Sequence, residues 1–164
     1  MKKFGSKRRQ GGFNLIELSV VMVLVGIVML GSMKIIPNVM FSMDTSSLSA
    51  EVADVRTASI SWKSSRPNFT GVGMAALCSS GRQLLTESIC GTDGLGTAAN
   101  PWGGNYTVAV STNVSQFDVT ITNLPTERIY EIGDALAPIS ADRCSSSDSC
   151  SSLDISGSQI TVTF

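Results

Sequence analysis

The chain has 164 residues, contains no histidine, and has a formal net charge of −1 from 12 basic and 13 acidic side chains. Histidine is the commonest general base and metal ligand, so its absence argues against a Ser-His-Asp hydrolase and most metalloenzymes. Five of the 12 basic residues lie in the first twelve positions, which leaves seven against 13 acidic residues in the rest of the chain. That remainder lacks the cation excess that phosphate contacts need. We therefore expect no catalytic residues, no metal or cofactor, and no nucleic acid partner.

A long apolar segment follows the basic N-terminus. Residues 13–33 form an uninterrupted apolar run with one charged side chain, that of Glu17. A helix of about 20 apolar residues crosses the core of a bilayer, and basic residues beside such a span stay on the cytoplasmic side. The run is too long for a secretory signal peptide, whose apolar region spans about 7–15 residues. An ordinary membrane anchor remains an alternative.

Helical periodicity continues beyond the apolar run. Pro37 predicts a kink or break, and Asp44 offers a new N-cap at which the helix would restart. Further along, apolar side chains recur at helical spacing and fall on one face. These side chains are Leu48, Val52, Val55 and Trp62. Pro67 closes the element, because the residue before proline disfavours the helical region. The sequence thus predicts one long helix from about residue 13 to 65, with an interruption left open.

The remainder of the chain carries strand and loop signals. Residues 106–110 and 117–122 are rich in β-branched and aromatic side chains, and the polar segment between them suits a hairpin loop. Residues 159–164 alternate between apolar and polar side chains, as in a half-buried strand. Residues 127–136 place apolar side chains on one face of a short helix. We expect an α+β fold, in which the amphipathic half of the long helix packs on a small antiparallel sheet.

Two further expectations concern the C-terminal part of the chain. Residues 68–105 are rich in Gly, Ser and Thr, and we expect one short helix there, near 74–77 or 82–88. Trp102, Tyr106 and Phe117 are interpreted as core of the sheet rather than as a stacking platform for nucleic acid, since no basic groove accompanies them.

Three aspartates, Asp142, Asp148 and Asp154, recur at a regular interval near the C-terminus. Their spacing differs from that of an EF-hand calcium loop, whose oxygen ligands lie mostly at alternate positions. We interpret these residues as scattered surface acids rather than as a calcium site.

The stretch GGFNLIEL at 11–18, behind the basic leader and ahead of the apolar run, resembles the type IV prepilin signal. The resemblance implies that a membrane-embedded prepilin peptidase cuts between Gly12 and Phe13 and methylates the new amine of Phe13. It divides the chain into a removed leader (1–12), a long N-terminal helix (13–66) and a globular head (67–164). The implied fold is that of a pilin.

The same resemblance gives a role to Glu17. A carboxylate at the edge of a membrane span is costly unless it is paired or reaches the headgroups. The resemblance implies that Glu17 pairs with the N-terminal amine of Phe13 in a neighbouring subunit during assembly. Residues 13 and 17 lie one turn apart on one helix face, and such a pair sets register more than it adds net stability. The alternative is that Glu17 only snorkels to the headgroups.

A second resemblance concerns the head. The segments NPWGGNYTV at 100–108 and FDVTITNLP at 117–125, with the late pair Cys144 and Cys150, resemble type IVb pilins of the conjugative-plasmid and enteric kind. The implied function is a structural subunit that waits in the bacterial inner membrane. It then polymerises with other copies, through its apolar helix, into an extracellular pilus for adhesion, aggregation or conjugation. The implied partners include an assembly platform and its ATPase.

Three alternatives to this interpretation stay open. A type II secretion pseudopilin and a minor tip pilin would share the prepilin signal. A membrane-anchored enzyme or binding protein would keep its leader uncleaved.

The four cysteines form an even set beyond the membrane segment, which indicates disulfides in an oxidising compartment. They are Cys78, Cys90, Cys144 and Cys150. We favour pairing by proximity, Cys78 with Cys90 and Cys144 with Cys150, each closure worth about 2–3 kcal/mol. A cross-link between the 78–90 region and the C-terminal loop stays open as the alternative.

Overall fold

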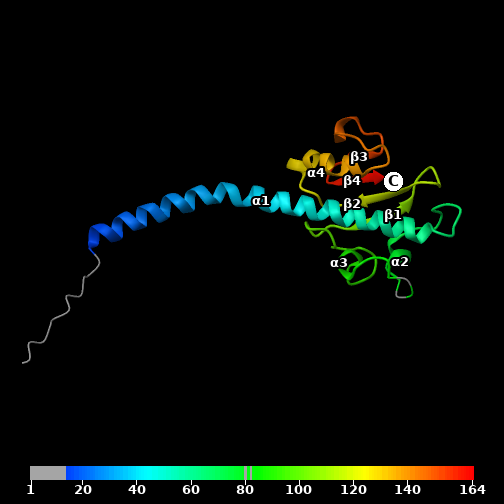
Figure 1. Cartoon of the computed structure of the whole chain (residues 1–164), viewed down its shortest axis with the longest axis horizontal. Helices are drawn as coiled ribbons and strands as arrows, with labels where there is room; N and C mark the ends of the chain where they lie inside the picture. Colours follow the sequence, from blue (N-terminus) through cyan, green and yellow to red (C-terminus); the bar gives the residue numbers. More distant parts are fainter. Residues whose placement is uncertain (1–13, 80, 82) are drawn as a thin grey trace, which may run out of the picture. The chain divides into compact units, whose positions relative to one another are not determined.

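The computed structural model describes residues 14–79, 81 and 83–164, without the side chains of residues 32–35. The chain divides into two compact units, Met1–Phe41 and Ser42–Phe164, here called the N-terminal unit and the head unit. The boundary falls inside helix α1 (Leu15–Lys63), so the second half of this helix belongs to the head unit. Figure 1 shows the elements in chain order.

Helix α1 is a continuous α-helix of 49 residues. It passes through Pro37 and Asp44, the two places where the sequence left an interruption open. Proline removes one bond from the helical ladder, but the bonds on either side are enough to carry the helix on. The prediction of one long helix is confirmed.

The head unit contains a four-stranded antiparallel sheet built from β1 (Tyr106–Val110), β2 (Phe117–Ile121), β3 (Leu153–Ser156) and β4 (Gln159–Thr163). The strand order is β1-β2-β4-β3. The three predicted strand segments are present as β1, β2 and β4. Strand β3 was missed, because it is short and follows a serine-rich segment that predicts only a loop.

The remaining helices of the head unit are short. Helix α2 (Met74–Leu77) lies at the first of the two expected places, and α3 (Glu87–Cys90) overlaps the second, so both form. Helix α4 (Ile129–Leu136) begins two residues later than predicted, because a 3-10 turn precedes it after Pro125. The 3-10 turns are η1 (Thr126–Arg128), η2 (Ala137–Ile139) and η3 (Ser147–Ser149).

One face of the sheet is apolar and the other is polar. In one row Val108 lies opposite Val119, Val119 opposite Val162, and Val162 opposite Leu153, and all four are buried. Since side chains alternate along a strand, the next row on the opposite face is polar. That row holds Thr107, Thr120, Thr161 and Asp154. The α+β arrangement predicted from the sequence is confirmed.

Helix α1 crosses the apolar face of the sheet within the head unit (Figure 1). Leu48, Val52 and Val55 are fully buried, and Trp62 is 6% exposed, as their spacing predicted. The buried Tyr106 hydroxyl of β1 donates a hydrogen bond to the carboxylate of Glu51 on α1. Burial, then this bond, raises the pKa of Tyr106 far above its usual value of 10. Tyr106 therefore stays protonated and remains a donor between helix and sheet.

The loop before β1 closes on the buried side chain of Asn100. Its Oδ1 accepts the backbone N–H groups of Trp102 at 3.0 Å and Gly104 at 2.8 Å, and its Nδ2 donates to the carbonyl of Thr122 at 2.8 Å. Asn100 thus ties the loop to the end of β2. The prediction that Trp102 belongs to the core is wrong: the side chain is half-buried, because it lies in this turn rather than in the strand.

A methyl group added at Gly104 tests this loop. Its Cβ would lie 1.9 Å from the carbonyl oxygen of Thr122 and 2.6 Å from the amide nitrogen of Asn100. We expect Gly104→Ala to lower the free energy of unfolding by about 3 kcal/mol. The melting temperature of the detergent-solubilised chain should fall by on the order of 10 °C. Gly81→Ala is the control, since its Cβ would meet no atom within 4 Å. Equal melting temperatures for the two variants would contradict this packing.

Candidate functional site

The expected cleavage and methylation site, Gly12 and Phe13, lies outside the described residues. The described chain begins at Asn14, whose carbonyl accepts the N–H of Leu18 at 3.1 Å. Helical hydrogen bonding therefore reaches back to Asn14, the second residue after the expected junction. Cleavage there would leave the new amine within one turn of the start of α1.

Glu17 lies in the first turn of α1, and its side chain is exposed. Among the described residues, no hydrogen bond or ion pair to its carboxylate occurs. The N–H groups of a first helical turn lack partners within the helix, and a negative charge there is favoured by the helix dipole. Glu17 is thus well placed for its helix and available to a donor from outside the chain.

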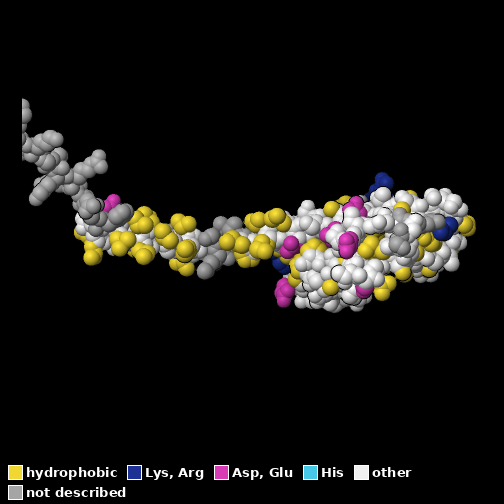
Figure 2. Space-filling view, turned by 90° about the horizontal axis from the view of Figure 1, so that it is seen from below, with side chains coloured by type: hydrophobic (Ala, Val, Ile, Leu, Met, Phe, Trp, Pro, Cys, Tyr) yellow, Lys and Arg dark blue, Asp and Glu magenta, His cyan; other side chains and the backbone are white. Residues whose placement is uncertain are grey.

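The N-terminal unit exposes apolar side chains at successive positions, and so on all sides of α1. Figure 2 shows the hydrophobic side chains along one face of this helix. Leu15 is 82% exposed, Met22 66% and Leu30 71%. In the part of the chain that the structure describes, α1 is the one helix long and apolar enough to cross a membrane, judged by length and composition. A helix that is apolar all round needs lipid or protein around it.

A polar side chain within this apolar surface has its partner in the helix itself. The hydroxyl of Ser19 donates to the carbonyl of Ile16 at 2.7 Å. Such a bond satisfies the hydroxyl without any water, so Ser19 adds little cost in an apolar environment.

Two disulfides join neighbouring segments of the head unit. Cys78 and Cys90 have an S–S distance of 2.07 Å and connect the end of α2 to the end of α3. Cys144 and Cys150 have an S–S distance of 2.13 Å and close the loop that contains η3. The pairing is local, with Cα–Cα distances of 5.7 and 5.5 Å that fall in the usual range for a disulfide.

Helix α4 holds the second disulfide loop in place. The Oδ1 atom of Asp134 accepts the backbone N–H of Ser147 at 2.8 Å and its hydroxyl at 2.7 Å. These bonds lower the pKa of Asp134. Gly133 allows this approach, because a Cβ there would lie 2.9 Å from the Cβ of Ser147. Sequence reasoning missed this contact; an Asp on a helix and a Ser in a distant loop carry no signal that they meet.

The three aspartates near the C-terminus share no hydrogen-bond partner among the described residues. Asp142 accepts a hydrogen bond from the hydroxyl of Ser151 at 2.6 Å, and Asp148 and Asp154 are exposed. Among the residues that the structure describes, His, Cys, Asp and Glu form no group of three that could hold a metal ion.

Residues 7–33 match a family model described as the prokaryotic N-terminal methylation motif. The match covers the expected Gly12–Phe13 junction, Glu17 and the apolar run. It supports a precursor of the type IV pilin-like kind, either pilus subunit or pseudopilin, that is anchored in a membrane and processed by a prepilin peptidase. Neither a curated protein sequence nor a solved structure matches the chain.

The hydrogen bonds at Asp134 predict a pH-dependent stability. They favour the carboxylate, so the pKa of Asp134 in the folded chain lies below its unfolded value of about 3.9. Their contribution is fully present above the unfolded pKa and is lost as the pH falls through the folded pKa. We expect Asp134→Asn to melt below wild type at pH 7, and the difference to shrink below about pH 4.

Thermal unfolding from pH 7 to about pH 2.5 measures this difference. Asp148→Asn is the matched control, because the Asp148 carboxylate is exposed and accepts no hydrogen bond from the described residues. A difference between Asp134→Asn and wild type that stays constant over the whole range would contradict the assignment.

Proposed function

We propose that this chain is a structural subunit of a type IV pilus, cut and N-methylated by a prepilin peptidase and polymerised through α1 into a surface filament. The observation that carries the proposal is the methylation motif at residues 7–33, which runs directly into a helix with apolar side chains exposed on all sides. The motif supplies the processing step, and the exposed apolar surface supplies a reason to assemble. No step of this function requires catalysis by the chain.

Assembly exchanges one apolar environment for another. Before assembly, lipid covers the exposed side chains of the N-terminal unit; in the filament, the same helix of other copies covers them. Such an exchange gains little from the hydrophobic effect itself, so packing and polar pairing must select the arrangement. The pairing of Glu17 with the Phe13 amine of a neighbour would supply that selection. The assembly platform and ATPase would drive extraction from the membrane.

The second candidate is a pseudopilin of a type II secretion system, because the methylation motif is common to both kinds of subunit. We favour a type IVb-like pilus subunit on the two disulfide loops of the head unit. Small stapled loops suit a head that is displayed outside the cell, in adhesion, aggregation or conjugation.

Processing at Gly12 is the first test. Mass spectrometry of the exported chain should show an N-terminus at Phe13 that carries one methyl group. Replacing Gly12 with a larger residue should abolish the cut, because a Cβ there hinders entry of the backbone into the protease site. Exported chain that retains Met1 would refute the pilin proposal.

Glu17 provides the second test. Glu17→Ala should leave processing intact and lower the yield of sheared fibre, relative to total processed subunit, by about tenfold, since removing one partner of an interfacial charge pair costs several kcal/mol. Glu17→Asp keeps the charge and should lose much less. Membrane retention should hold in Glu17→Ala, because the alanine makes the span more apolar. Normal fibre yield from Glu17→Ala would mean that the carboxylate only reaches for the headgroups.

A further inference from the structure

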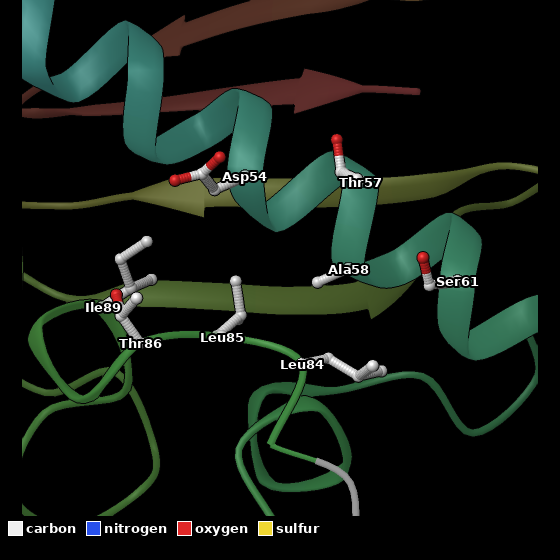
Figure 3. A pocket seen from close by; sticks show the side chains of 8 residues that line it. All are labelled: Asp54, Thr57, Ala58, Ser61, Leu84, Leu85, Thr86 and Ile89. Carbon is white, nitrogen blue, oxygen red and sulfur yellow. The ribbon is translucent and has the colours of Figure 1, made fainter.

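A groove of about 280 Å³ runs beside α1 in the head unit, between the helix and the segment that leads into α3 (Figure 3). Its apolar wall is formed by Ala58 of α1 and by Leu85 and Ile89 from the other side. The rim on the helix side carries Asp54 and Ser61. The groove therefore combines an apolar lining with a polar edge on one wall.

The polar edge of the groove accepts hydrogen bonds. The carboxylate of Asp54 has only acceptor atoms when ionised, and it is exposed with no hydrogen bond or ion pair among the described residues. The hydroxyl of Thr57, also on the rim, already donates to the carbonyl of Ala53 at 2.9 Å, which leaves its lone pairs free. The described residues that line the groove include no Lys or Arg. An acceptor edge above an apolar wall fits a side chain with an apolar stem and a cationic, donor-only end.

One described cation of the head unit has no partner for its charged end. Four others are engaged: Arg128 pairs with Glu131, and three more lie over aromatic rings. These three are Arg56 over Phe164, Lys63 over Phe69 and Arg66 over Trp62. The fifth, Arg143, is exposed, and its guanidinium makes no contact of these kinds among the described residues.

The backbone on both sides of Arg143 is held in place. Its own N–H donates to the carbonyl of Ser140 at 3.2 Å, and the neighbouring Ala141 donates to the carbonyl of Thr163 at 2.9 Å. The disulfide of Cys144 follows directly. Arg143 has a φ of 51°, in the left-handed region that side chains rarely adopt. A fixed backbone reduces the entropy lost on binding, so Arg143 is presented in a form suited to contact.

The groove and Arg143 belong to opposite edges of the sheet. The segment before β1 bonds to the β1 edge, where Tyr106 donates to Gly96, while the loop of Arg143 bonds to the β4 side through Thr163. Figure 1 likewise shows α3 and the loop before β3 on opposite sides of the head unit. A contact between two different surfaces of one molecule repeats from copy to copy, and produces an open helical array when the rotation does not close.

We propose that the groove beside Asp54 receives the side chain of Arg143 from a neighbouring copy of this chain, in a lateral contact between heads. This inference rests on the proposed filament and names one contact within it. The guanidinium fork matches a carboxylate in a two-bond arrangement, and the stem of the arginine packs on the apolar wall. Ser61 and Thr57 accept the remaining N–H groups.

Charge exchange between the two positions tests the contact. Asp54→Arg and Arg143→Asp should each lower fibre yield, relative to processed subunit, by about tenfold, because each leaves two like charges facing each other. The double variant restores opposite charges and should recover at least about half of the wild-type yield. Asp148→Arg is the control, because it changes the charge as Asp54→Arg does but lies outside the groove, and it should assemble normally. All variants should melt like wild type, since no described residue forms a hydrogen bond or ion pair with the side chain of Asp54 or Arg143.

A cross-link identifies the neighbour directly. Fibres of the Arg143→Lys variant treated with a carbodiimide should yield an amide between position 143 and Asp54. In fibres mixed from isotopically light and heavy subunits, light–heavy linked peptides should appear.

The outcomes separate this inference from the proposed function. Wild-type chain that forms no fibre would defeat the proposed function. If the wild-type chain forms fibres, three results would overturn the contact and leave the proposed filament intact. The single variants could assemble normally, the double variant could stay impaired, or position 143 could be cross-linked to a carboxylate other than Asp54.

Discussion

One helix has to satisfy two different surroundings, and the rest of the structure follows from how α1 does so. Its first half is apolar on every side, so it requires lipid or other protein around it. Its second half is apolar on one face only, and that face is covered by the sheet of the same chain. The change of pattern occurs within one continuous run of helical hydrogen bonds. The helix is therefore both an anchor in one unit and a core element in the other.

The head unit covers the apolar face of the second half of α1, which would otherwise be exposed to water. Rows of β-branched side chains provide an apolar surface, and a tyrosine hydroxyl gives one directional contact between sheet and helix. Hydrogen bonds that the side chains of Asn100 and Asp134 accept then fix the loops at either edge. These polar contacts differ between the two loops, which gives the two edges of the sheet different surfaces. A subunit with two different edges is suited to repeating contacts rather than to a closed pair.

Periodicity and local composition were sufficient to predict the main elements of this fold. The spacing of Leu48, Val52 and Val55 identified the buried face of α1. The β-branched and aromatic composition of β1 and β2 and the alternation in β4 identified the sheet. Periodicity failed where few apolar residues are involved. Strand β3 presents only Leu153 and Ile155, and Trp102 lies in a turn whose geometry depends on Asn100.

The functional residues likewise fall into those that the sequence could predict and those that it could not. The motif around Gly12, Phe13 and Glu17 is contiguous in sequence, so it can be recognised from the sequence alone, before the fold is known. The contacts of Asp134 with Ser147, and the groove beside Asp54, join residues that are far apart in the chain. Their assembly depends on tertiary packing, and no pattern of residue types signals it.

The short span of the two disulfides has a consequence for the order of events in the life of the chain. The bridged cysteines are separated by 12 and 6 positions, and neither bridge joins one strand to another or the sheet to α1. No covalent bridge therefore holds the register of the sheet or the burial of the helix face. No strand pairing seen in the sheet requires a bridge, and each bridge constrains directly only the segment between its own two cysteines, of which Cys90 and Cys150 are buried. Oxidation of the two cysteine pairs and pairing of the strands are in this way separate events, since neither bridge spans the sheet.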